Sequence, residues 1–420
     1  MNRTLLTAAA LLLATGATVA GPLPGTPLPP ADAALAAIEA KPAVVAAKAG
    51  VEAAQARARA LRAGPHEFAL QGIYQQRDVN REGTFDEWEA GLVRGFRLPG
   101  KARVDRNLGA VASEHAANAL ADARHGEARA LLAAWFDWLR ASAAAQRDRD
   151  VASALERTAT AVQERLDRGD ASPMQLELAL AEKGKAIALS YRSQAAARQA
   201  LRVLATEFPG LPLPGEPPEA GAPVAPSRPL DDWPGVIMQR SHELRLAELD
   251  LERATLTAER AGRDRWPDPQ VGLRILNERG GAEKVVGLSF QVPLPSSYRS
   301  AQAAEARSEA KAAAARLETA RRALELMAAA DVAAVRAALS AWEPMQEAGT
   351  NAERHLVRAQ RAYELGETSL TELLLSLRSA NDIIYERRLA GLEAHEALAR
   401  LAIDAHELWA MHDEGDHDHE

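Results

Sequence analysis

The residues best suited to bind a ligand form a short run of histidines and acids at the carboxyl end of the sequence. His412, His417 and His419 are interspersed there with five carboxylates over residues 412–420. Imidazole and carboxylate groups together suit borderline divalent ions such as Zn²⁺, Ni²⁺, Cu²⁺ or Co²⁺. A flexible segment would bind such ions weakly, because no surrounding residues fix the orientation of the ligands. The alternative is an acidic tail with incidental histidines.

Other chemistry is not indicated by the sequence. The seven remaining histidines are scattered along predicted helices or at their ends, and we interpret them as solvated or packing residues. No cysteine is present, which excludes a thiol nucleophile, a disulfide and a thiolate metal site. A phosphate-binding glycine loop, a His-Glu-x-x-His helix and a nucleophile elbow are also missing. We therefore expect no enzyme and no cofactor.

The charge pattern argues against a nucleic-acid partner. The chain of 420 residues has 50 Lys and Arg against 58 Asp and Glu, a formal net charge of −8. Its basic residues are spread along the chain, whereas nucleic-acid binders concentrate them on one face. Aromatic residues make up only 4%, and alanine supplies most of the apolar content. This composition favours long, closely packed helices over a large aromatic core.

Two predicted turns between helices have the clearest local sequence patterns. Gly169 and Gly366 each stand where a helix end favours a left-handed residue. Ser172 and Ser369 follow, each three residues before a glutamine or glutamate, which is the pattern of a capping box. In the second turn the box glutamate is Glu372. Capping alone explains these residues, so a functional role for them needs further support.

Composition divides the chain into segments. Residues 1–20 have a basic start, a short apolar stretch and small residues before a cleavage site near Ala20, as in a secretory signal peptide. A short transmembrane anchor is the alternative, although the apolar stretch is shorter than the roughly 20 residues of a spanning helix. Residues 21–30 form a Pro-rich lead-in, expected to be flexible or extended, and residues 207–232 a Pro-rich linker. The linker separates two halves, 31–206 and 233–411, ahead of the tail at 412–420.

The two halves resemble each other. Equivalent positions lie 200 residues apart at Val51 and Leu251, 196 apart at Gly91 and Gly287, and 197 apart at the turn glycines. The offset between equivalent positions is thus nearly constant along the two halves, which predicts a tandem structural repeat.

Each half reads as helix, two strands, a very long helix, a tight turn and a helix. Opening helices are predicted at 31–62 and 232–262, strands within 68–98 and 270–292, and helices of about 100 Å at 101–166 and 298–365. A kink is expected at Pro344. Apolar and polar residues alternate along the predicted strands, with Val286, Leu288 and Phe290 on one side, as in a lipid-facing barrel wall. A soluble hairpin packed on helices is the alternative. Four strands cannot close a barrel, so several copies would have to join.

On these residues the sequence resembles the TolC-like outer-membrane efflux proteins, and most closely the outer-membrane subunits of cobalt-zinc-cadmium type cation exporters. The resemblance covers essentially the whole mature chain. It rests on four pieces in order: residues 98–103 (LPGKAR), 266–272 (WPDPQVG), 287–295 (GLSFQVPLP) and 363–370 (YELGETSL).

The resemblance implies a mostly helical chain with four strands, assembled as a homotrimer. Three chains would form a twelve-stranded β-barrel in outer-membrane lipid and a helical tunnel in the periplasm. The tip turns at Gly169, Ser172, Gly366 and Ser369 would face a periplasmic adaptor that links the channel to an inner-membrane pump.

Function follows from the same resemblance. It implies a passive conduit, here for divalent heavy-metal cations, with drugs, other small molecules or secreted polypeptides as alternative cargo. It also makes Glu372 a candidate pore-mouth acid, although Leu375 stands where related channels have a second acid. The alternative from a different class is a soluble periplasmic coiled-coil scaffold.

Overall fold

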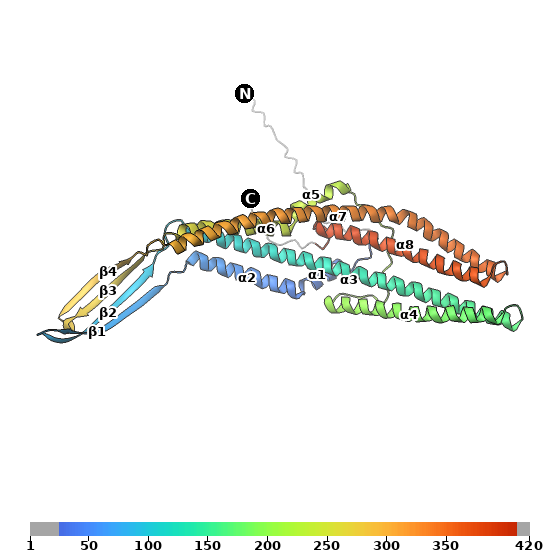
Figure 1. Cartoon of the computed structure of the whole chain (residues 1–420), viewed down its shortest axis with the longest axis horizontal. Helices are drawn as coiled ribbons and strands as arrows, with labels where there is room; N and C mark the ends of the chain where they lie inside the picture. The colour runs from blue at the N-terminus through green and yellow to red at the C-terminus, as the bar shows by residue number, and fades with distance from the viewer. Residues whose placement is uncertain (1–24, 410–420) are drawn as a thin grey trace, which may run out of the picture.

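The chain is a long rod of helices with a small β-sheet at one end, as the computed structural model of residues 25–409 shows (Figure 1). The expected order of helix, strands, long helix, turn and helix occurs twice, so the predicted fold class is confirmed. In chain order the elements are α1 (Ala31–Glu39), α2 (Pro42–Ala63), β1 (Phe68–Val79), β2 (Gly83–Gly95), α3 (Lys101–Asp167), α4 (Pro173–Glu207), η1 (Leu230–Asp232), α5 (Trp233–Arg240), α6 (His242–Asp264), β3 (Gln270–Glu278), η2 (Arg279–Gly281), β4 (Glu283–Gln291), α7 (Ser297–Glu364) and α8 (Leu370–Asp404).

The long helices α3 and α7 set the length of the rod. They contain 67 and 68 residues, which at 1.5 Å per residue gives about 100 Å each. Alanine and straight-chain charged residues, all good helix formers, dominate both sequences. α7 continues through Pro344, so the expected kink does not interrupt the helix.

Shorter helices lie end to end beside each long one. α2 and α4 pack along α3, while α6 and α8 pack along α7. The single opening helices expected over 31–62 and 232–262 were wrong, because each is broken. Lys41 is extended, since the following Pro42 disfavours the helical conformation there, and Ser241 caps a new helix by accepting a hydrogen bond from Leu244 N. The breaks lie about 200 residues apart, so they belong to the repeat.

The largest hydrophobic core lies in the middle of the rod, and the Pro-rich segments pack on it. The indole of Trp135 is buried and donates a hydrogen bond to Pro27 O at 2.5 Å. Gly221 N in the linker donates to Gly25 O at 2.9 Å, and the buried His395 contacts Gly221 O. Residues 25–30 and the linker therefore hold the two repeats together.

The four strands form one antiparallel sheet in the order β1-β2-β3-β4. The central pairing of β2 with β3 joins the two repeats. Among the described residues β1 and β4 each have a strand partner on only one side, so both edges of the sheet are open.

Candidate functional site

One face of the sheet is covered with exposed apolar side chains. Four leucines, one from each strand, stand in register across it: Leu70, Leu92, Leu273 and Leu288. Their exposed fractions are 83%, 46%, 48% and 80%. A folded protein in water rarely leaves such a continuous apolar surface open, so this face indicates a contact with lipid or with another molecule.

Aromatic side chains border the leucine row on the same face. Phe68 and Phe290 lie on the helix side of it, and Tyr74 and Trp88 lie toward the hairpin turns. Arg94 interrupts the alternation that the sequence shows, and its guanidinium lies 4.6 Å above the Phe68 ring. The six-residue step from Phe68 to Tyr74 spans about 20 Å, close to the roughly 25 Å apolar band of outer-membrane strands.

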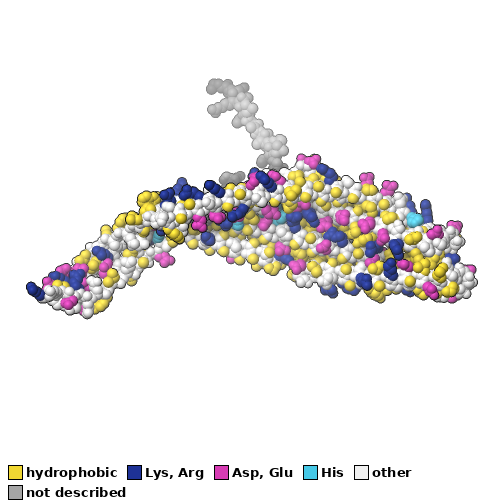
Figure 2. All heavy atoms as spheres, in the orientation of Figure 1, with side chains coloured by type: hydrophobic (Ala, Val, Ile, Leu, Met, Phe, Trp, Pro, Cys, Tyr) yellow, Lys and Arg dark blue, Asp and Glu magenta, His cyan; other side chains and the backbone are white. Residues whose placement is uncertain are grey.

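Charged residues lie beyond this band. Figure 2 shows basic and acidic side chains gathered at the hairpin end of the sheet, while most of the visible strand surface is hydrophobic or uncharged. There Arg279 forms an ion pair with Glu82 at 3.0 Å, joining the two hairpins. The surface thus changes from apolar to charged at the end of the strands.

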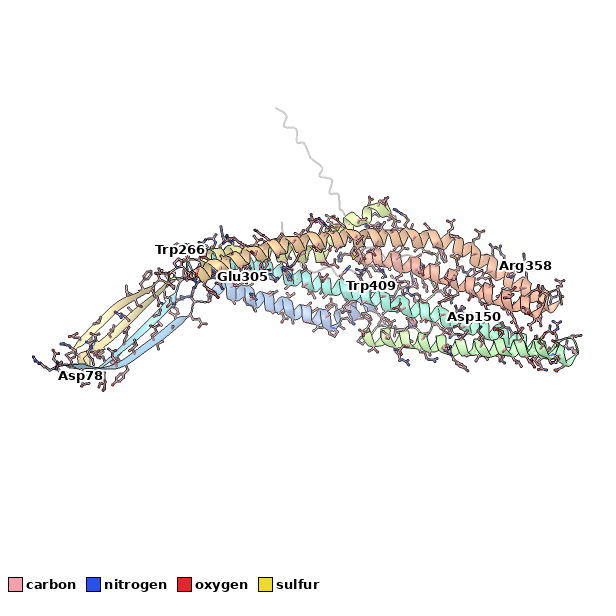
Figure 3. All side chains as sticks on the ribbon, viewed as in Figure 1. Asp78, Asp150, Trp266, Glu305, Arg358 and Trp409 are labelled. Atoms are coloured by element: carbon pink, nitrogen blue, oxygen red, sulfur yellow. The ribbon has the colours of Figure 1, made fainter. Side chains whose placement is uncertain are left out.

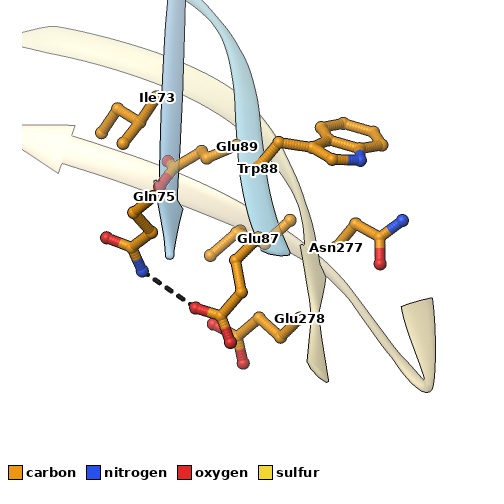
Figure 4. Close-up of a pocket in the computed structure, with 8 residues that line it drawn as sticks. Ile73, Gln75, Glu87, Trp88, Glu89, Asn277 and Glu278 are labelled. Carbon is orange, nitrogen blue, oxygen red and sulfur yellow. Dashed lines mark hydrogen bonds between the residues drawn. The ribbon is translucent and has the colours of Figure 1, made fainter. Parts of the chain in front are cut away.

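The opposite face of the sheet is polar. Glu87, whose side chain is 3% exposed, accepts a hydrogen bond from Gln75 Nε2 at 2.9 Å and pairs with Arg77 at 3.2 Å. A cavity of about 60 Å³ lies beside these groups, with Glu89 and Glu278 also on its wall (Figure 4). That volume is far below the several hundred Å³ of a ligand pocket. The sheet therefore has one mainly apolar face and one mainly polar face, although Ile73 and Val285 also lie on the polar one.

Buried ionic contacts fix the sheet to the rod. Lys101 Nζ, at the start of α3, donates to Trp266 O at 2.7 Å and pairs with Asp268 at 2.8 Å and Asp264 at 2.9 Å. Figure 3 places Trp266 at this junction between strands and helices. Asp268 also accepts hydrogen bonds from Leu98 N at 3.0 Å and pairs with His66 at 2.9 Å. Two motif pieces that are far apart in the sequence, 98–103 and 266–272, thus meet in space.

A second ionic contact supports the same junction. Arg97 donates to Leu61 O and Arg62 O, two carbonyls in the last turn of α2, and pairs with Asp105 at 2.8 Å. Arg260 of α6 reaches the other oxygen of Asp105 at 2.6 Å. One carboxylate therefore connects helices of both repeats next to the sheet.

The two tip turns lie together at the end of the rod opposite the sheet (Figure 1). Gly169 and Gly366 are left-handed, with φ of 84° and 77°. Ser172 and Ser369 form the reciprocal hydrogen bonds of capping boxes. Behind the turns, a hydrophobic cluster joins the two hairpins; its buried members are Leu155, Ala159, Val162, Ala179, Ala186, Tyr363, Leu370, Leu373 and Leu377.

Glu372 is exposed and acts as a helix cap. Its carboxylate accepts hydrogen bonds from Ser369 N at 2.8 Å and Ser369 Oγ at 3.1 Å. The bond from the Ser369 backbone, and then the one from its side chain, hold the pKa of Glu372 below its usual value. Leu375, one turn further on, is 60% exposed. The cap accounts for the position of Glu372, and its role at a pore mouth stays a prediction.

Three histidines that are far apart in the sequence meet in the middle of the rod. The His406 ring lies 5.0 Å from His125 and 4.5 Å from His242, and His125 Nε2 is 3.3 Å from Asp404 Oδ1. Burial and the two neighbouring rings lower the pKa of His406 to about 4. These residues are far apart in the sequence, and nothing local in the chain indicates that they meet. Nearby, Trp409 also lies at mid-rod (Figure 3).

Two sequence predictions lie outside the described residues: the signal peptide at 1–20, and the metal ligands His412, His417 and His419. Within 25–409, no group of three or more histidines or acids has the arrangement of a metal site. In the same range, every helix is either too short or too polar to cross a bilayer.

No family profile and no curated protein matches the sequence. Solved structures do match its fold. A membrane protein from Pseudomonas aeruginosa has a TM-score of 0.73 at 17% identity, with 89% of each chain covered. The outer membrane protein VceC from Vibrio cholerae has 0.71 at 18%, with 90% of this chain and 96% of that one covered. The open-state MtrE outer membrane channel of Neisseria gonorrhoeae has 0.70 at 18%, with 89% and 88% covered. The chain thus has the fold of outer-membrane channel proteins over nearly its whole length.

Proposed function

We propose that the chain is one protomer of a homotrimeric outer-membrane efflux channel that extends into the periplasm. Three sheets would join through the open edges of β1 and β4 into a closed twelve-stranded barrel. The observation that carries this proposal is the leucine row with its aromatic borders, at the end of a rod of about 100 Å. The polar face of the sheet would line the lumen. Such a conduit is passive and performs no catalysis.

The tips would meet a periplasmic adaptor and, through it, an inner-membrane pump. Exposed apolar side chains support a docking role for this end: Met174, Leu365 and Leu375 are 73%, 57% and 60% exposed. They lie close to the turn residues Gly169, Ser172, Gly366 and Ser369, which fix the shape of the tips.

Divalent heavy-metal cations are the proposed cargo, supported by the sequence resemblance to cation exporters and by the histidines of the tail. Deleting the gene in its native host tests this. The deletion should increase sensitivity to Zn²⁺, Co²⁺ or Cd²⁺, and re-expression of the chain should restore resistance. Sensitivity to organic drugs instead of metals would assign the other cargo class.

Neighbouring positions on β1 allow a direct test of membrane insertion. Leu70 belongs to the apolar face and Gln71 to the opposite one, and both are exposed in the single chain. An arginine on a lipid-facing strand costs about 2–4 kcal/mol at the bilayer midplane. Leu70→Arg should therefore reduce the amount of heat-modifiable trimer in outer-membrane fractions, while Gln71→Arg should not. Wild-type protein in the soluble fraction, or equal effects of both changes, would favour the scaffold alternative.

A further inference from the structure

Two buried carboxyl groups face each other where the repeats meet. Asp331 of α7 is 8% exposed, and Asp404, the last residue of α8, is 2% exposed. The chain around them packs together, since Val332, next to Asp331, shares a buried cluster with Ala405, next to Asp404. The two carboxyls lie within hydrogen-bonding reach of each other if one of them holds a proton. Asp331 Oδ2 and both oxygens of Asp404 are buried, and no N–H or O–H group in the described part of the chain is aligned to give them a regular hydrogen bond.

Among the described residues, cationic groups form ion pairs with Asp404 and not with Asp331. His125 Nε2 and Arg129 Nε lie 3.3 and 3.5 Å from Asp404 Oδ1. Within residues 25–409, no ion pair reaches Asp331, and Arg400 of the same region is paired with Glu396 at 3.3 Å. The charged and titratable groups around the two acids are Asp122, His125 and Arg129 of α3, Arg240 of α5, His242 and Glu243 of α6, Arg400 of α8 and His406 after it.

This asymmetry decides which acid is ionised. Burial, together with the hydrogen bond and the negative charge of Asp404, raises the pKa of Asp331 to about 7. Burial also disfavours ionised Asp404, but the close contacts with His125, a protonated Asp331 and Arg129 outweigh burial and lower the pKa of Asp404. Two carboxylates this close in a buried site cannot both be charged without a large penalty, so one proton supplies the missing donor.

We propose that Asp331 and Asp404 share one proton at neutral pH, and that losing it loosens the junction between α7 and the end of α8. Deprotonation would place a second negative charge in a site closed to water. The two anions would repel each other, while the nearby cations His125, Arg129, Arg400 and Arg240 are already engaged with Asp404, Glu396 or Glu407. The middle of the rod would then respond to pH in the range just above neutrality.

Infrared spectroscopy of the purified full-length protein tests the shared proton. The band of a protonated carboxylic acid should disappear as the pH rises through about 7. Asp331→Asn should lack this titrating band, because the amide replaces the acid and donates to Asp404. Asp382→Asn, a change at an exposed residue of α8, should leave it unchanged. A titrating band of equal size in Asp331→Asn would overturn the proposal.

Hydrogen exchange tests the loosening. After correction for the intrinsic effect of pH, exchange over residues 398–404 should accelerate above neutral pH in the wild type and stay constant in Asp331→Asn. Identical pH dependence in both proteins would refute the switch. If Asp331→Asn does not fold, Asp404→Asn serves in its place. This variant removes the neighbouring negative charge and should lower the pH at which the carboxylic-acid band disappears. An unchanged midpoint would again refute the proposal.

Discussion

Replacing Lys101 by methionine tests whether the junction between sheet and rod depends on one buried amine. The Lys101 side chain is 2% exposed and donates to Trp266 O, Asp268 and Asp264 at 2.7–2.9 Å. Methionine keeps an unbranched apolar stem and lacks only the terminal amine, so it removes the charge and all three hydrogen bonds.

The size of the effect follows from the groups left behind. Asp264 is 36% exposed and keeps its pairing with Arg260, so water and that arginine replace part of the loss. Asp268 is 12% exposed and keeps His66 and Leu98 N, but loses its strongest cation. Breaking a buried ion pair costs about 3–5 kcal/mol. Because both acids keep other partners, we expect the lower end, about 3 kcal/mol.

Urea unfolding of the purified protein, followed by tryptophan fluorescence, measures this loss. The matched control is Arg103→Met on the same helix, whose side chain is 66% exposed and 3.9 Å from Glu259. An exposed pair of that kind contributes about 0–1 kcal/mol. Equal midpoint shifts for the two variants would show that burial of Lys101 does not hold the junction together.

The same variant should change the acid dependence of stability. Burial alone would raise the pKa of Asp268, but Lys101, Leu98 N and His66 outweigh it and lower the pKa. A carboxyl with a lowered folded-state pKa stabilises the fold above its unfolded value of about 3.9, and loses that contribution as the pH falls further. The stability difference between wild type and Lys101→Met should therefore narrow below about pH 4. A constant difference down to pH 2 would contradict this assignment.

Three further predictions concern the tips and the tail. Ser369→Ala removes a helix cap and should lower the stability of α8 by about 1 kcal/mol. Hydrogen exchange in the first turn of α8 should therefore become faster, whereas exchange around Ser172 should not change. Glu372→Gln preserves the side-chain acceptor of the cap. If Glu372 lines the pore mouth, this change should alter the block of single-channel current by cations. An unchanged block would mean that Glu372 acts only as a helix cap. A protein lacking 412–420 should lose micromolar-range metal binding by calorimetry, and equal binding in both proteins would refute the ligand role of the tail.

Local patterns made most of the fold predictable. The capping box from Ser369 to Glu372 is complete within four residues, and strand alternation is visible within a single strand. The long helices end within one residue of their predicted limits. The helix breaks were missed although a signal for each was present, since Pro42 and Ser241 are ordinary first-turn and capping residues.

Contacts between distant segments were not predictable. Lys101 and Asp268 are 167 residues apart, and their contact depends on how the strands of both repeats leave the rod. Asp331 and Asp404 lie on different helices, whose relative rotation is set by packing along the whole rod. A single aspartate in a charged helix looks like a solvated residue, so the sequence contains no local signal for a buried pair.

The helix breaks at mid-rod have a consequence for the origin of the chain. Next to the first break, Lys41 pairs with Glu207 at 2.9 Å, and next to the second, Arg240 pairs with Glu407 at 3.3 Å. The first and last helices of each half therefore meet at mid-rod. An ancestral pair of identical subunits could thus have been fused by a short connector without moving either subunit. A present-day chain cut at the exposed residues 214–217 should reassemble from its two fragments.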